Sequence, residues 1–210
     1  MKDNCNLSLA WLCITVATIL ILLSCGTDHE AEIRELHHKY MEASMNHNIE
    51  ILSVMTAEDI VWQLGPFILR GKEEALGPHK YDEGTNCILE YSNVVIHGDT
   101  VEFMLDEKNE VITAVGMTRI RTFPRFIFKD GLVYKKEEWK PSTDREEYNE
   151  RAQPMRSWIR TEHPEAIKRL FNSKGNWVFS SKNGQLMVQL AKQWQEENRN
   201  ESNKPHGENR

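Results

Sequence analysis

Residues 56–76 read TAEDIVWQLGPFILRGKEEAL, and this stretch decides the fold. Ile60, Trp62 and Leu64 alternate with their neighbours, which is the period of a strand with one buried face. After a Gly-Pro turn signal, a short apolar run predicts a second strand, and a helical segment follows it. The predicted strand, turn, strand and helix lie at residues 56–64, 65–66, 67–70 and 72–76. This compact order indicates the front of a curved sheet wrapped round a helix.

The amino-terminal residues predict an export signal. The segment from Leu7 to Leu23 is apolar and nearly unbroken, and it follows Lys2, whose charge Asp3 offsets. It is shorter than the ~20 residues that a membrane-spanning helix needs. It is instead typical of the apolar region of a secretory signal peptide. The alternative is an uncleaved signal anchor, and both alternatives place the body of the chain outside the cytoplasm and attached to a membrane.

The end of this apolar segment resembles a lipoprotein signal. Leu22-Leu23-Ser24-Cys25 is similar to the lipobox of bacterial lipoproteins, whose cysteine is lipidated and becomes the first residue of the mature chain. The resemblance implies a signal peptide over residues 1–24, a spacer over 25–30 and a membrane anchor at Cys25. In the signal-anchor alternative Cys25 is incidental.

Composition excludes several classes of site. The formal net charge is −6 and the basic residues are scattered, which argues against nucleic-acid binding. Cys87 is alone in the body of the chain, so no disulfide framework can form there. The sequence has no CxxC and no HExxH motif, so no metal site is predicted.

The remaining pattern predicts helices followed by strands. Helices are expected at 31–47 and 49–55, and the third helix should not pass Gly77-Pro78 undistorted. The predicted strands span 88–97, 101–105, 111–128 and 132–139, with a polar loop at 107–110. Pro124 fits only an edge or a bulge. Three helices in the N-terminal half and a run of antiparallel strands make an α+β arrangement.

Four short motifs in this order resemble the nuclear transport factor 2-like superfamily and, more narrowly, its SnoaL-like branch. They are Asp59-Ile60-Val61-Trp62, Gly71-Lys72-Glu73, Gly98-Asp99-Thr100-Val101 and Phe128-Lys129-Asp130-Gly131-Leu132-Val133. The resemblance covers about residues 30–140 and implies a domain over 31–141. It implies a cone-shaped, strongly curved sheet whose mouth is closed by helices, leaving an apolar pocket. It implies no cofactor and leaves a homodimer open.

Residues 142–198 predict a helical extension packed on the cone, because so short a segment makes a thin core of its own. A helix start is expected at 142–144, and Pro164 suits a first helical turn. Trp158, Trp177 and Trp194 need an apolar surface to cover, so the extension is expected to close the mouth of the cone. Residues 199–210 are polar and without periodicity, which predicts a disordered tail.

Seven residues are candidates for the pocket. The ligand-binding candidates are Trp62, Phe103, Met117, Arg119 and Arg121, and the catalytic candidates are His79 and Tyr91. Trp62 is expected on the concave side of the first strand, with ordinary core as the alternative. His79 follows the interrupted third helix, where the alternative is a solvated loop histidine. Tyr91 shares a face with Leu89, so its hydroxyl is a candidate to point inward.

The two arginines leave two alternatives open. Arg119 and Arg121 are in phase with Val115, Met117 and Phe123. They are either anion ligands in the pocket, met through a guanidinium fork, or an outer face paired with acids. Two acids on the neighbouring strand, Glu102 and Asp106, are expected on a solvated outer face. The adjacent histidines 37 and 38 face different ways, so one is expected under the sheet, the other is solvated, and no metal pair is predicted.

The fold resemblance does not determine the activity, because function lies in sites carried by folds. The sequence predicts a lipid-anchored, extracytoplasmic domain of a bacterial cell envelope that binds a small, partly apolar molecule. The alternative is a cofactor-independent isomerase, dehydratase or cyclase, with His79 or Tyr91 as acid–base and Arg119 or Arg121 stabilising an oxyanion. Catalysis requires an ionisable group and an oxyanion donor to converge within about 3 Å of one reacting atom.

Overall fold

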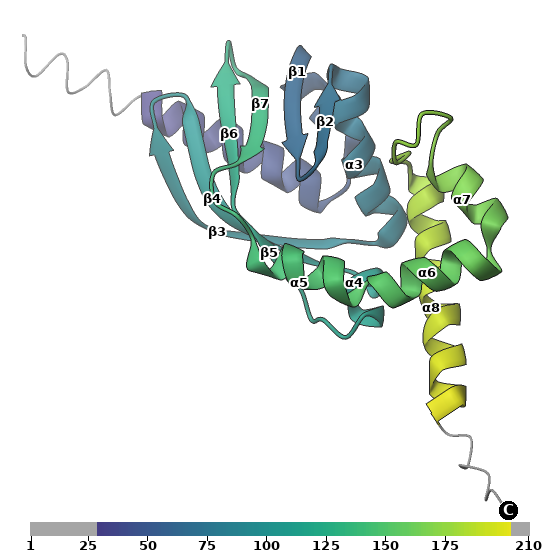
Figure 1. Ribbon diagram of the computed structural model, residues 1–210. Helices are drawn as coiled ribbons and strands as arrows, with labels where there is room; N and C mark the ends of the chain where they lie inside the picture. Colours follow the sequence, from purple (N-terminus) through teal and green to yellow (C-terminus); the bar gives the residue numbers. More distant parts are fainter. Residues whose placement is uncertain (1–28, 203–210) are drawn as a thin grey trace, which may run out of the picture.

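The computed structural model describes residues 29–202 (Figure 1). The predicted signal peptide, the lipidation site at Cys25 and residues 203–210 lie outside the described residues. A curved, unclosed sheet forms the centre, and its strand order is β2-β1-β7-β6-β4-β3, with β5 pairing with β4. The strands are β1 (Thr56–Leu64), β2 (Phe67–Arg70), β3 (Ile88–His97), β4 (Thr100–Lys108), β5 (Ile120–Thr122), β6 (Pro124–Lys129) and β7 (Leu132–Glu138).

The sheet is antiparallel except where β1 and β7 run parallel. β3 and β4 are long and bent, so the sheet curls round its inner face (Figure 1). The α+β class and the curved antiparallel sheet are therefore confirmed. Pro124 opens β6, where its missing N–H removes no interior ladder bond, as expected for a strand-terminal proline.

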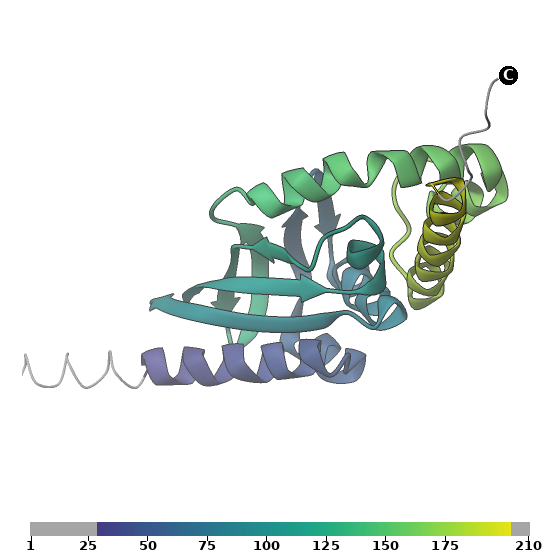
Figure 2. The ribbon, with the colours of Figure 1, turned by 90° about the horizontal axis from the view of Figure 1, so that it is seen from below.

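A helix over residues 29–45, the short helix α2 (Ile49–Met55) and the longer helix α3 (Lys72–Thr85) belong to the first half of the chain. The helix over 29–45 runs along β3 and β4 on one side of the sheet, and α5 and α6 lie on the opposite side (Figure 2). Tyr40 and Met41 of the first helix pack against Phe103 and Phe126 in the first hydrophobic core. The predicted order of helix, helix, strand, strand and helix is confirmed.

Several predicted boundaries were wrong. α3 continues through Pro78 to Thr85, so the helix does not end at Gly77-Pro78. A proline removes one helical hydrogen bond, and the buried side of α3 offsets that loss, because Leu76, Pro78 and His79 are all buried. Residues 110–114 form helix α4 (Glu110–Ala114) and not a strand, since the side chain of Asn109 caps its amino terminus by accepting from the Ile112 N–H at 2.9 Å.

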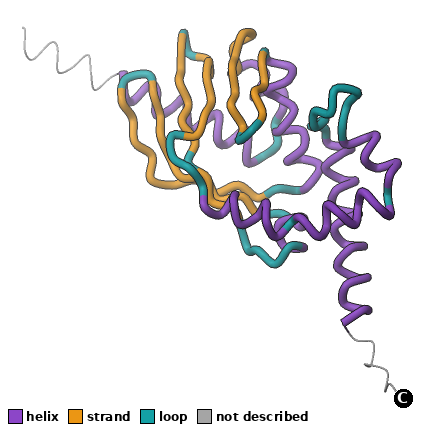
Figure 3. The backbone as a smooth tube through the Cα atoms, viewed as in Figure 1, coloured by secondary structure: helices purple, strands orange, loops and turns teal. Residues whose placement is uncertain are grey.

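The C-terminal extension contains four helices within the described residues. They are α5 (Thr143–Arg151), α6 (Gln153–Glu162), α7 (Pro164–Leu170) and α8 (Ser181–Ser202) (Figure 3). Ser142 is the N-cap of α5, and its hydroxyl also donates to the Arg121 carbonyl of β5. The predicted helix starts at Ser142 and Pro164 are confirmed. α8 runs to Ser202, so residues 199–202 are helical and not disordered as predicted.

The extension builds a second hydrophobic core together with α3, α4 and β5. Its largest buried members include Met155, Ile159 and Leu170. The helices α3 and α8 cross at their glycines, Gly84 and Gly184, so closely that an added Cβ at either position would meet backbone atoms of the other helix. The extension therefore packs directly on α3, α4 and β5.

Candidate functional site

A cavity of about 480 Å³ lies between the two cores. Its walls come from the helix over 29–45, the inner face of the sheet, α3 and the extension. Apolar and aromatic residues that line it include Met41, Trp62, Phe67, Leu89, Leu105, Phe126, Met155, Ile159, Phe171, Trp177 and Phe179. Polar and ionisable residues that line it include His79, Tyr81, Asp82, Asn109, Glu107, Lys136, Glu138, Arg145, Tyr148, Arg156 and Arg160. This volume and mixed lining are typical of a small-molecule site.

Strand geometry brings two of the ionisable groups inward. Along β4, Val101 and Phe103 are buried on the inner face. Glu107 lies four positions after Phe103, with Leu105 between them, so its side chain points to the same face. The pairing of β7 with β6 shifts its register between Val133 and Lys135. Lys136, and not Lys135, therefore points inward. The curved sheet thus carries a carboxyl and an amine on the inner face.

The Lys136 amine sits in a buried polar network. Its Nζ donates to His79 Nε2 at 3.1 Å and lies 3.5 Å from the Tyr40 hydroxyl, which is itself 3.1 Å from His79 Nε2. The Nζ also lies 3.4 Å from the centre of the Trp62 ring, so the ring face contacts the amine. Lys136 is 3% exposed and His79 is 6% exposed. These contacts hold one cationic group rigidly against the cavity wall.

Burial moves the pKa values of Lys136, Asp82 and Glu107 toward neutrality. Desolvation lowers the pKa of Lys136 to about 7, against the opposing pull of the Asp82 and Glu107 carboxylates. Desolvation and then the neighbouring Glu107 charge raise the pKa of Asp82 to about 8. The pKa of Glu107 is also raised, by desolvation first. Because Asp82, Glu107 and Lys136 influence one another, they titrate as one coupled set.

The two carboxyls are free to face a ligand. No hydrogen bond to the side chain of Asp82 or Glu107 is made within the part of the chain that the structure describes. Both side chains are half-buried because they border the cavity. Two tyrosines, Tyr81 and Tyr148, border the same space, and desolvation raises the pKa of each hydroxyl, so both stay protonated and can donate hydrogen bonds. The cavity therefore presents proton donors and acceptors next to its apolar lining residues.

The structure brings only two of the seven predicted site residues to the cavity. Trp62 and His79 line it, but His79 lies inside α3 and is buried, so it is not a loop histidine near the mouth. Phe103 is on the inner face as predicted, but the first helix covers it: the His37 ring lies 4.6 Å from the Phe103 ring centre. Met117 is buried in the second core and does not reach the cavity.

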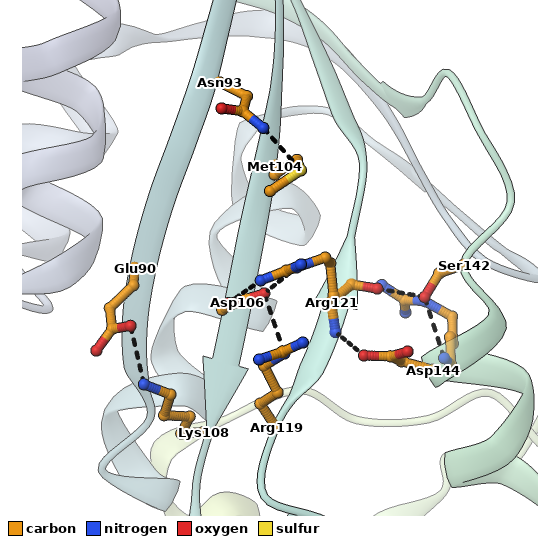
Figure 4. A network of polar contacts seen from close by, with 10 residues as sticks. Glu90, Asn93, Met104, Asp106, Lys108, Arg119, Arg121, Ser142 and Asp144 are labelled. Carbon is orange, nitrogen blue, oxygen red and sulfur yellow. Dashed lines mark hydrogen bonds and ion pairs between the residues drawn. The ribbon is translucent and has the colours of Figure 1, made fainter.

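Arg119 and Arg121 take the outer-face alternative. Arg121 makes a bidentate pair with Asp106, with Nε and Nη2 each 2.7 Å from a carboxylate oxygen (Figure 4). The hydrogen bonds from Arg121 hold the pKa of Asp106 below its usual range. Arg119 Nε lies 3.6 Å from the same carboxylate. Alternation along β5 turns Ile120 and Thr122 toward the cavity, so their neighbours point away from it.

Tyr91 is also turned away from the cavity. Its hydroxyl lies 2.8 Å from His38 Nδ1, and its ring packs on the first core, so the sheet and the first helix occupy its two sides. The neighbouring His37 is 1% exposed under the sheet, whereas His38 is exposed. The expectation that these adjacent histidines face different ways is confirmed.

Sequence reasoning missed Asp82, Glu107 and Lys136. Asp82 lies beyond the proline at which the third helix was expected to end. Glu107 was assigned to a loop, although it continues the alternation of Phe103 and Leu105, and this signal was available. Lys136 points into the cavity because of a local register shift in β7, which cannot be predicted from alternation of residues along the strand.

Within residues 29–202 there is no cluster of three or more histidine, cysteine, aspartate or glutamate side chains placed to hold a metal ion. Within the same residues no helix has both the length and the apolar character needed to cross a membrane.

Comparison with known proteins adds solved structures of similar shape. No family model matches the chain, and no curated protein matches it. A Sinorhizobium meliloti protein assigned as a polyketide cyclase is 16% identical, with a TM-score of 0.44 over 49% of this chain and 92% of its own. A Jannaschia protein assigned as a SnoaL-like polyketide cyclase is 15% identical, with a TM-score of 0.45 over 51% of this chain and 84% of its own.

An NTF2-like protein of unknown function from Cytophaga hutchinsonii is 12% identical, with a TM-score of 0.45 over 55% of this chain and 94% of its own. These structures include proteins described as SnoaL-like and NTF2-like. What this chain binds or transforms has to follow from its own side chains.

Proposed function

We propose that the cavity binds a small, partly apolar molecule and moves a proton on it in a cofactor-independent reaction. The observation that carries this proposal is the convergence of Asp82, Glu107 and Lys136 on one apolar cavity, each with its pKa moved toward neutrality. A proton-transfer group works best when its pKa lies near the operating pH. Isomerisation, dehydration and cyclisation of a carbonyl compound all need such a transfer.

The environments of the two carboxyls suit them to different roles. Asp82, with a pKa of about 8, keeps its proton at neutral pH and can act as a proton donor. Glu107, whose pKa desolvation also raises, is the proposed proton acceptor. The Lys136 amine, fixed on the Trp62 ring, would stabilise negative charge that develops on a ligand oxygen.

These assignments replace the catalytic residues expected from the sequence. His79 Nε2 is occupied by the Lys136 amine and the Tyr40 hydroxyl, so His79 is a positioning residue for Lys136. Burial, followed by the Lys136 charge, lowers the pKa of His79 well below its ordinary value, so its ring stays neutral. Tyr91, Arg119 and Arg121 do not reach the cavity.

The test uses 2-tetralone, a ketone with an aromatic body and acidic α-hydrogens, in D₂O. The full-length chain should accelerate the exchange of these hydrogens for deuterium, followed by proton NMR. Glu107→Gln should slow the exchange about 100-fold or more, in line with the usual contribution of a general base. Glu102→Gln, on the outer face of the same strand, is the matched control and should keep the wild-type rate.

A second function, binding without chemistry, has its own supporting observation. The Lys136 amine already contacts Tyr40, His79 and Trp62, which is an arrangement suited to orienting a ligand by a fixed charge. Native mass spectrometry of the same mixture separates the two functions. Retention of 2-tetralone with exchange at the buffer rate would contradict the catalytic proposal and support the binding module.

We also propose that the chain is held at a bacterial membrane surface through lipidated Cys25, outside the cytoplasm. The apolar segment from Leu7 to Leu23 and the lipobox-like residues that end it support this placement. Expression in bacteria with radiolabelled palmitate should label the wild-type chain in the membrane fraction. Cys25→Ser should remove the label, and a labelled variant would contradict lipidation at this residue.

A further inference from the structure

We infer that the C-terminal extension supplies an oxyanion-binding subsite to this cavity, so that the ligand is an amphipathic molecule with one anionic head. The subsite consists of Arg156 and Arg160 on α6, and both side chains line the cavity. The inference rests on the proposed function, because it names the ligand class of the same cavity. It also gives the extension a role in recognition besides closing the mouth.

The two guanidinium groups lie on one side of one helix. Their spacing of four residues places them a single turn apart, at about 5–6 Å between Cβ atoms. The buried Met155 directly precedes Arg156, and the buried Ile159 directly precedes Arg160. The helix therefore places its apolar side chains in the second core and its two arginines at the edge of the cavity. Such a pair can close on a carboxylate or phosphate from two directions.

Neither arginine has an acidic partner among the residues that the structure describes. Arg156 Nη2 donates to the neutral side-chain carbonyl of Asn149 at 3.0 Å, and its guanidinium lies 5.7 Å from the Tyr148 ring centre. By contrast, cavity-lining Arg145 is paired with Glu138 at 2.8 Å. The positive charge on α6 is therefore uncompensated at the cavity wall, and an anionic ligand would compensate it.

The subsite lies within electrostatic reach of the acid–base groups. The Arg156 charge acts on the hydroxyls of Tyr81 and Tyr148, and the Asp82 carboxyl also acts on Tyr81. If Arg156 binds the anionic group of a ligand, the apolar part of that ligand would lie against the aromatic residues that line the cavity, next to Asp82. This arrangement sets the orientation that a proton transfer between fixed groups requires.

The experiment compares three probes that share a naphthalene body: 2-naphthylacetate, 2-naphthyl phosphate and the neutral 2-naphthylacetamide. Dissociation constants are measured by isothermal titration calorimetry on the full-length chain. At least one anionic probe should bind about 10-fold or more tightly than the amide, since hydrogen bonds to charged groups are the strong ones. The preferred anion then distinguishes a carboxylate ligand from a phosphate ligand.

The variant Arg156→Gln/Arg160→Gln should remove this preference and leave amide binding unchanged. Arg169→Gln, an exposed arginine of α7 outside the cavity, is the matched control and should keep the preference. Equal binding of all three probes, or a preference that survives in the double variant, would overturn the oxyanion subsite alone. Binding of none of the probes would overturn the subsite together with the proposed ligand-binding function.

Discussion

At the scale of single residues, burial of ionisable side chains links the stability of this protein to pH. A group whose pKa differs between the folded and unfolded chain binds protons differently in the two states, so the free energy of unfolding changes with pH. Asp82 and His37 are two such groups, and their effects have opposite signs. Asp82 belongs to the cavity, whereas His37 belongs to the first core.

Asp82→Asn should stabilise the protein at alkaline pH. The folded-state pKa of Asp82 is about 8, above its ordinary value of 3.8, so between these values the folded chain holds a proton that the unfolded chain releases. The stability contribution is present at low pH and lost as pH rises toward 8. Asparagine removes that loss, worth about 2–5 kcal/mol. Melting temperatures at pH 4.5 and pH 8 should differ between variant and wild type only at pH 8, and an equal difference at both would contradict the assignment.

His37→Phe should reduce the loss of stability in acid. Desolvation, and then the charges of His38 and Arg34, lower the pKa of His37 from 6.5 to about 4. The unfolded chain therefore binds a proton between pH 6.5 and 4 that the folded chain does not, and stability falls as pH falls through that window. The loss amounts to about 3 kcal/mol at pH 4.

Urea denaturation at pH 7 and pH 4.5 measures this effect as the change in the stability difference between His37→Phe and wild type. A variant at the exposed His97, His97→Asn, is the control and should follow the wild type at both pH values. A stability difference that is the same at both pH values would show that His37 does not titrate as described.

Single residues were also where prediction from sequence succeeded least. Alternation correctly placed Trp62 and Phe103 on the inner face, because the pleat of a strand sends every second side chain to one side. It could not show that the first helix covers Phe103, since that depends on packing between distant elements. The sequence also gives no sign of the register shift in β7, so the inward position of Lys136 could not be predicted.

At the scale of elements, the crossing of α3 and α8 joins the cone to the extension. Gly84→Ala should destabilise the protein by about 1–3 kcal/mol through overpacking. A Cβ at this position would approach the Ser181 carbonyl carbon and Cα to 2.8 Å, and backbone atoms cannot move aside as a flexible side chain can. This effect opposes and should exceed the gain of about 1 kcal/mol that alanine brings to a helix interior.

Chemical denaturation of Gly84→Ala and of the control Glu83→Ala measures this effect. Glu83 is exposed on the same helix, so its variant should lie within about 0.5 kcal/mol of the wild type. A Gly84→Ala protein at least as stable as the wild type would show that α8 does not pack so closely on α3.

Elements were predicted well where local signals agreed with tertiary packing. The strands β1 and β2, the turn between them and the N-cap at Ser142 were all visible in the sequence. Prediction failed at Pro78, where burial of α3 outweighs the loss of one hydrogen bond. It also failed at residues 110–114, where the Asn109 cap outweighs the β-propensity of Val111 and Ile112.

At the scale of the whole molecule, two hydrophobic cores enclose one cavity, and each contributes part of its wall. Deleting residues 142–210 should therefore lower both solubility and melting temperature, because it exposes Val111, Ile112 and Ile120 of the second core. Thermal unfolding and centrifugation of the shortened chain measure both quantities. A soluble product with the melting temperature of the full chain would contradict the view that the extension completes the fold.

The overall α+β architecture was predictable because the order of helices and strands is a property of periodicity along the chain. The cavity was predictable only as a consequence of the family resemblance. Its chemistry was not, because Asp82 on α3, Glu107 on β4 and Lys136 on β7 come together only through the curvature of the sheet and the length of α3.

A titration of the ligand-free protein tests whether Asp82, Glu107 and Lys136 form one coupled acid–base site. Carbon-detected NMR of the side-chain carboxyls, assigned with Asp82→Asn and Glu107→Gln, reports the pKa of each carboxyl. We predict that Asp82 titrates near pH 8, that Glu107 titrates above its ordinary value, and that Glu107→Gln lowers the pKa of Asp82 by removing a like charge. Two independent titrations near pH 4, unaffected by either variant, would contradict the account.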